Sequence, residues 1–212
     1  MPADLILENG IVILQGTEIE RSVTIRAGKI EGVYSPENAP SAKNRIDCTN
    51  LYILPGAIDI HVHLRDLNQS EKEDYASGTR AAAAGGVTTV VDMPNSVPPV
   101  LSQEVLNEKV ASARQQRYVN VGFYAGVPKT PSKFEDSIIS QVLGIKVYPH
   151  TPLDKGKYTK KRIHGCMQIS AKHEIPLLLH PDASKPRTKP KDIDDYYKVH
   201  NCENEVKSLQ MF

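Results

Sequence analysis

The fold is decided by residues 57–93, which read AIDIHVHLRDLNQSEKEDYASGTRAAAAGGVTTVVDM. Apolar runs rich in Ile and Val open and close this stretch, and a helical pattern lies between them. Ser70 and Glu73 have the spacing of a capping box at the start of that helix, and Gly85-Gly86 is its expected end. A strand, a helix and a second strand in this order predict a βαβ unit with parallel strands.

The same alternation continues along the chain. Strands are expected at residues 57–63, 88–93, 119–126, 144–148 and 175–180. Further helices are expected to begin at Ser102, at Ser132 with Glu135, at Thr159 and at Asn201, the last with Val206 and Leu209 facing inward. Five such units indicate an α/β fold, either an open doubly wound sheet or the first five-eighths of a (β/α)8 barrel.

Residues 4–54 follow a different pattern. Short β-type runs at 5–14, 22–25, 29–33 and 51–54 are separated by turn residues such as Asn9-Gly10, which predicts two hairpins. So few strands do not close a sandwich by themselves, so partner strands are expected from elsewhere. The chain therefore divides near residue 55.

Composition excludes several classes of protein. The formal net charge is +1, which gives no electrostatic reason to expect nucleic acid or an anionic membrane as a partner. No apolar run approaches the roughly 20 residues that span a bilayer, and Asp4 stands where a signal peptide would be basic. Three widely separated cysteines argue against a disulfide framework. We expect a cytoplasmic protein.

Two histidines stand at the end of the first predicted strand. Side chains alternate along a strand, so His61, His63 and Arg65 project from one face. Two imidazoles at this spacing can bind one metal ion with fixed geometry. The competing interpretation is a pair of polar core or surface histidines, but burying two imidazoles without a ligand is costly. The pattern therefore favours a metal site.

Later strands end in further polar residues. An unpaired ammonium is costly to bury, so the lysine in the middle of an apolar strand, Lys146, has two interpretations. Its pKa is depressed, and its neutral amine can then react with carbon dioxide to give a carbamate ligand. Alternatively, its side chain snorkels to the strand end and keeps its charge in water. His180 is a candidate for a second metal beside the first pair. Asn95 is either a donor to substrate or a turn residue next to Pro94. The remaining histidines are interpreted as solvated: His150, His164, His173 and His200.

These motifs together resemble one family. Residues 55–66, PGAIDIHVHLRD, look like the signature opening of the dihydroorotases, which are cyclic amidohydrolases of the amidohydrolase superfamily. Residues 72–79 (KEDYASGT), 85–89 (GGVTT) and 93–99 (MPNSVPP) continue the resemblance in the same order. It implies that residues 1–54 are part of a small β-sandwich. It also implies that residues 55–212 are about five units of a (β/α)8 TIM-type barrel.

The resemblance implies a role for each matched position. His61 and His63 would hold the more buried of two zinc ions, a carboxylated Lys146 would bridge both, and His180 would bind the second. Arg65 and Asn95 would bind the substrate carboxylate, Arg65 as a bidentate fork. The family reaction is the reversible closure of N-carbamoyl-L-aspartate to dihydroorotate in pyrimidine biosynthesis, in which the metals activate water and polarise the ring amide.

Two departures from the family pattern stand out. The fifth strand is followed by His180-Pro181-Asp182-Ala183 in place of a His-Ala-Glu-Asp-like sequence, so Asp182 is a candidate for the acid position. A further histidine ligand and the proton-shuttling aspartate lie beyond residue 212 in the family. We therefore expect the isolated chain to be inactive and aggregation-prone, with a homo-oligomer or a C-terminal half as its partner.

Two other functions stay open at this point. An allantoinase or hydantoinase opens with a similar His-x-His, although it less often has Arg at position 65 and Met-Pro-Asn at 93–95. A non-catalytic scaffold that docks another pyrimidine-pathway enzyme is the third possibility.

Overall fold

The computed structural model describes residues 1–131, 134, 136–182 and 190–210. Two compact units make up the chain, Met1–Gly56 and Ala57–Phe212. Each is described by itself below.

The first unit is a five-stranded sheet. Its strands are β1 (Ala3–Leu14), β2 (Thr17–Arg26), β3 (Lys29–Tyr34), β4 (Ala42–Asp47) and β5 (Tyr52–Ile53), with a short 3-10 turn, η1 (Pro36–Asn38). β1 pairs antiparallel with β2, and β2 with β3, which confirms the two predicted hairpins. β4 and β5 both run parallel to β1. Sequence reasoning missed β4, because its residues AKNRID are mostly polar and exposed and lack a strand's apolar alternation.

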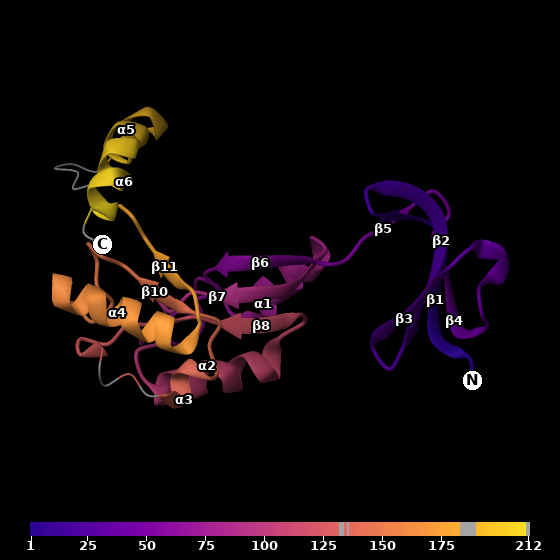
Figure 1. Ribbon diagram of the computed structural model, residues 1–212, viewed down its shortest axis with the longest axis horizontal. Helices are drawn as coiled ribbons and strands as arrows, with labels where there is room; N and C mark the ends of the chain where they lie inside the picture. Colours follow the sequence, from indigo (N-terminus) through magenta and orange to yellow (C-terminus); the bar gives the residue numbers. More distant parts are fainter. Residues whose placement is uncertain (132–133, 135, 183–189, 211–212) are drawn as a thin grey trace. The chain divides into compact units, whose positions relative to one another are not determined.

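The second unit is built from parallel strands in chain order. They are β6 (Ala57–Val62), β7 (Val87–Asp92), β8 (Asn120–Phe123), β9 (Ala125–Gly126), β10 (Ile145–Val147) and β11 (Leu177–Leu179). One sheet has the order β6-β7-β8 and the other β9-β10-β11 (Figure 1). The strand predicted at 119–126 is interrupted at Tyr124, so that β8 pairs with β7 and β9 with β10. The prediction of an α/β fold is confirmed, and the sheets do not close into a barrel within the described residues.

Six helices of this unit are described: α1 (Tyr75–Ala84), α2 (Gln103–Gln116), α3 (Asp136–Ile139), α4 (Lys160–His173), α5 (Ile193–Val199) and α6 (Cys202–Leu209). The predicted starts at Ser102, Thr159 and Asn201 are confirmed as helix N-caps. Ser132 and Glu135 lie outside the described residues. α5, which the sequence analysis missed, begins after Asp192.

The predicted cap of α1 was wrong. Asp74 caps the helix, accepting from the Ser77 amide at 2.7 Å, and Ser77 completes the capping box. Ser70 instead follows a 3-10 turn, η2 (Leu67–Gln69). The pair Ser70 and Glu73 and the pair Asp74 and Ser77 have the same spacing. The helix begins after Asp74, next to its first buried residue, Tyr75. The predicted end was right, since Gly85 follows the last helical residue.

The inward face predicted for α6 was also wrong. Val206 and Leu209 are 52% and 44% exposed, whereas Ser208 is buried. The Ser208 hydroxyl lies 2.9 Å from Nε2 of His150, so His150 is hydrogen-bonded rather than solvated as predicted.

Helices α1, α2 and α3 pack on the β6-β7-β8 sheet. The main core contains Tyr75, Leu106 and Ile138 from these helices, together with Val90 and Phe123 from the sheet. This packing fixes the strands whose ends carry the polar residues. Among the described residues, no helix is long and apolar enough to cross a membrane.

Candidate metal and substrate site

The predicted site residues sit at the carboxyl ends of parallel strands. His61 belongs to β6, and His63 and Arg65 follow it. Lys146 is on β10, and His180 comes directly after β11. β6 lies in one sheet and β10 and β11 lie in the other, and the charge of Lys146 acts on both His61 and His180.

The four predicted metal ligands are coupled electrostatically, since Lys146, His63 and His180 all act on His61. The rings of His61 and His63 lie 5.4 Å apart, centroid to centroid. Burial lowers the pKa of His61, and the charge of Lys146 lowers it further, with smaller effects from His63 and His180. The pKa of His180 is lowered in the same way, first by burial and then by Lys146. Both imidazoles therefore favour the neutral form that a metal requires.

Lys146 is the most buried member of the group. Its side chain is only 3% exposed, and its amine donates to the Leu179 carbonyl at 3.3 Å. No carboxylate in the described part of the chain forms an ion pair with it. Burial lowers the pKa of Lys146, because an ammonium loses its hydration there. The side chain does not reach bulk water by snorkelling, which was the competing interpretation.

Asn95 lies in the loop after β7 and faces a histidine. Its Oδ1 is 2.7 Å from Nδ1 of His63. An amide oxygen only accepts, so Nδ1 carries the proton and the lone pair is on Nε2. Hydrogen bonds of this kind orient metal-binding histidines in proteins. Asn95 is thus more than a turn residue beside Pro94.

Arg65 opens an unusual backbone segment. Arg65, Asp66 and Leu67 have φ angles of 54°, 56° and 49° in succession. Non-glycine residues rarely adopt this left-handed conformation, and a run of three needs support from the surrounding structure. The Asp66 side chain is buried, and its Oδ2 has no hydrogen-bond partner among the described residues.

Tyr148 is a site residue that sequence reasoning missed. Its ring centroid lies 5.4 Å from that of His180 and 5.5 Å from Nζ of Lys146. Burial raises the pKa of Tyr148 to about 12, and the nearby charge of Arg65 opposes the rise. The signal was available: Tyr148 stands two residues after Lys146, so the two share a face of the strand.

Asp182 forms a pair with His200, which was predicted to be solvated. The Asp182 Oδ2 lies 2.7 Å from His200 Nδ1, and the Tyr196 ring stacks on the imidazole at 4.1 Å. His180 and these three residues line a cavity of about 660 Å³. Asp182 is therefore engaged with His200 in this structure.

The donor set fits a metal under one condition. No three His, Cys, Asp or Glu side chains of the described residues come close enough to hold an ion. Two imidazoles and a lysine amine remain, and a protonated lysine would repel a cation. The set fits a metal when Lys146 is converted to an anionic oxygen donor, for which its buried, easily neutralised amine is suited.

Comparisons with known proteins identify the family that this chain resembles. Residues 51–137 match the family described as dihydro-orotase-like. Dihydroorotase from Aeropyrum pernix is 34% identical over 180 residues, which are 85% of this chain and 39% of that protein. Allantoinase from Arabidopsis thaliana is 37% identical over 178 residues, which are 79% of this chain and 35% of that protein.

The fold has solved counterparts. L-hydantoinase (dihydropyrimidinase) from Arthrobacter aurescens superimposes with a TM-score of 0.85 at 20% identity, over 99% of this chain and 49% of that one. This chain spans less than half the length of each of these relatives. The family match and the relatives place the chain among the cyclic amidohydrolases, the family that includes dihydroorotase and allantoinase.

Proposed function

We propose that this chain carries the first part of the active site of a zinc-dependent dihydroorotase. The observation that supports the proposal is that His61 lies next to His63 and feels the charge of a buried Lys146, which forms no ion pair among the described residues. Arg65 follows His63 after one intervening residue, Leu64, so a cation for a substrate carboxylate is close in sequence to the proposed metal ligands.

In this proposal Lys146 would supply an anionic oxygen ligand once it is converted to a carbamate. Its neutral amine attacks the carbon of carbon dioxide, a new N–C bond forms, and the electrons of one C=O π bond move onto oxygen. The nitrogen then loses one proton to solvent, which gives a carbamate whose single negative charge is shared by two oxygens. His61 and His63 would hold one zinc ion, and His180 would contribute to holding a second. When bound, zinc activates water and polarises the amide of the ring.

The remaining residues hold the substrate. Arg65 binds the carboxylate of dihydroorotate or N-carbamoyl-L-aspartate, where a planar guanidinium can make two parallel hydrogen bonds. The proton of His63 Nδ1 is held by Asn95 Oδ1, which keeps Nε2 available to the metal. The Asn95 amide nitrogen remains a donor for the same carboxylate.

The parallel strands are proposed to be part of a (β/α)8 barrel. β6 to β11 follow one another in chain order with helices between most of them, and the hydantoinase fold accommodates almost the whole chain. The first unit, with β4 and β5 parallel to β1, would be part of the accompanying small sandwich.

An allantoinase is the alternative function. The allantoinase of Arabidopsis thaliana and a protein of Oryza sativa subsp. japonica named probable allantoinase are 37% and 40% identical to this chain over the matched residues. The chemistry of position 65 separates the two, because dihydroorotate has a carboxylate for Arg65 and allantoin has none. A non-catalytic scaffold remains the third possibility.

The test is a complementation assay. The chain is co-expressed with the part of Aeropyrum pernix dihydroorotase that the match leaves uncovered, and zinc content and turnover of dihydroorotate and allantoin are measured. We expect zinc to bind and dihydroorotate alone to be turned over, with loss of both when Lys146→Ala is introduced. Turnover of allantoin alone would establish the alternative. Complexes that contain no zinc and turn over neither substrate would support the non-catalytic scaffold.

A further inference from the structure

A buried polar network lies directly beneath the proposed site. Asp92, the last residue of β7, is 1% exposed and accepts three interactions. Its Oδ2 lies 2.6 Å from Nζ of Lys109 on α2 and 2.9 Å from the Tyr75 hydroxyl on α1. Its Oδ1 accepts from the backbone amide of Leu64 at 3.0 Å. Lys109 and Tyr75 are both fully buried.

Stability alone does not account for this network. A buried ion pair loses the hydration of both partners, and an apolar pair of similar volume often stabilises a fold equally well or better. The Asp92 carboxylate does something an apolar residue cannot do. With Oδ2 taken by Lys109 and Tyr75, its orientation is set, and Oδ1 is aimed at one backbone amide.

The Leu64 amide lies between two of the proposed site residues. Leu64 stands between His63 and Arg65, and the left-handed segment of Arg65, Asp66 and Leu67 begins one residue later. A strained segment of this kind keeps its conformation only when neighbouring contacts determine it. The hydrogen bond from Leu64 to Asp92 is the contact at its entrance.

The same network also reaches the loop after β7, which carries Asn95. Lys109 Nζ lies 3.5 Å from the Met93 carbonyl, two residues before Asn95. The Met93 amide in turn donates to the Val62 carbonyl at 2.9 Å, next to His63. One buried cation therefore connects the two loops that meet in the hydrogen bond between His63 and Asn95.

We propose that Asp92, fixed by Lys109 and Tyr75, is a positioning residue that sets His63 and Arg65 relative to Asn95. This inference rests on the proposed function in one respect, namely the metal and substrate that His63, Arg65 and Asn95 are proposed to bind. The positioning of these side chains by Asp92 is a property of the chain without any ligand.

The test compares variants of the full chain by amide hydrogen exchange. Lys109→Met removes the charge and keeps the length of the side chain, and Lys109→Arg keeps the charge. Leu106→Ala is the matched control, because Leu106 is a fully buried residue of the same helix that belongs to the apolar core. The reference amide is Ile145, which donates to the Pro176 carbonyl at 2.9 Å.

We expect Lys109→Met to speed exchange at Leu64 about tenfold more than at Ile145, because the carboxylate loses its orientation. Lys109→Arg should restore much of the protection, and Leu106→Ala should change both amides alike. Cobalt affinity of Lys109→Met should fall about tenfold or more, as for other losses of ligand support, while Leu106→Ala keeps it.

Tyr75→Phe provides a second variant if Lys109→Met does not fold. It removes one hydroxyl from Asp92 and leaves the ring in the core, and we expect selective exchange at Leu64 here too. Exchange at Leu64 that rises only in step with Ile145 in both variants would overturn the proposal. A wild-type chain that binds no cobalt would count against the proposed function, and the exchange data would still decide the positioning role.

Discussion

The Nδ1 atom of His63 lies 2.7 Å from Oδ1 of Asn95, although 32 residues separate them in the sequence. This hydrogen bond joins the loop after β6 to the loop after β7. It fixes which nitrogen of His63 carries the proton, and so which nitrogen faces a metal. The residue expected to bind substrate thus also supports a residue expected to bind zinc.

Replacing Asn95 tests this relationship. Asn95→Leu removes the acceptor, so the His63 ring loses its fixed tautomer and orientation. We expect cobalt or zinc affinity to fall about 10- to 100-fold, the range for lost support of a ligand. Titration with cobalt followed by its visible spectrum measures this. Ser96→Ala is the control, since the Ser96 hydroxyl donates to the Pro98 carbonyl and not to His63. Equal affinity of Asn95→Leu and wild type would contradict the role.

Lys146 should make stability depend on pH. Burial lowers its pKa from 10.5, so between the lowered value and 10.5 the unfolded chain holds more protons than the folded one. The free energy of unfolding therefore rises with pH across this window. Lys146→Met lacks the effect, so it should be the more stable protein at pH 7, with a difference that shrinks toward pH 10. Urea unfolding of both proteins at several pH values measures it. A difference independent of pH would show that Lys146 is not titrating in this way.

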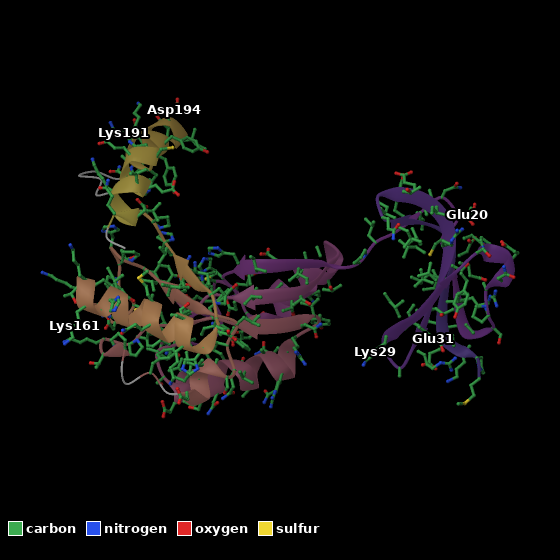
Figure 2. The ribbon with its side chains drawn as sticks, viewed as in Figure 1. Glu20, Lys29, Glu31, Lys161, Lys191 and Asp194 are labelled. Carbon is green, nitrogen blue, oxygen red and sulfur yellow. The ribbon has the colours of Figure 1, made fainter. Side chains whose placement is uncertain are left out.

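The same lysine should act on His61. Burial is the first cause of the lowered pKa of His61, and the charge of Lys146 is the second. Lys146→Met should therefore raise the pKa of His61 in an NMR titration. Lys161→Met is the control, since Lys161 is exposed and projects outward from α4 (Figure 2). An unchanged titration in Lys146→Met would mean that the two groups are not electrostatically coupled.

Much of the parallel-strand unit was predictable, because apolar runs and glycine or proline boundaries report strands directly. His61, His63 and Lys146 could be named as candidate ligands because the strands that carry them were predicted. The partners of these residues could not be. Nothing in the sequence links Asp92 to Lys109, which are 17 residues apart and meet only because α2 packs on the sheet.

Elements without a distinctive local pattern were also missed. Tyr124 breaks a run that reads as one strand, and only the pairing of its two halves with different neighbours shows the break. β4 is polar and owes its strand conformation to hydrogen bonds with β1. Tertiary contacts decide both cases.

Helix α1 offers a direct test of competing caps. Asp74 accepts from the Ser77 amide, whereas Ser70 makes no side-chain cap bond to this helix. Asp74→Ala should lower the free energy of unfolding by about 1 kcal/mol, the usual cost of losing an N-cap. Ser70→Ala should leave it unchanged within about 0.5 kcal/mol. Urea unfolding of the two variants at pH 7 compares them, and equal losses would reinstate Ser70 as a cap.

The edge strand β6 should govern the solubility of this chain. β6 pairs with β7 on one side, and among the described residues no strand pairs with its other side. Ile58 and Ile60 are 65% and 61% exposed on it. An exposed apolar edge of this kind recruits other chains, and a lysine on the edge opposes such pairing. Ile60→Lys should therefore reduce aggregation, measured by light scattering at rising protein concentration, with little change in the midpoint of urea unfolding.

Ile145→Lys is the contrasting variant, because Ile145 is fully buried on β10 and an unpaired charge there should unfold the protein. Aggregation of Ile60→Lys equal to wild type would place the self-associating surface elsewhere. If Ile60→Lys stays soluble but no longer assembles with the remainder of a dihydroorotase, the same edge is the one that a completing strand would use.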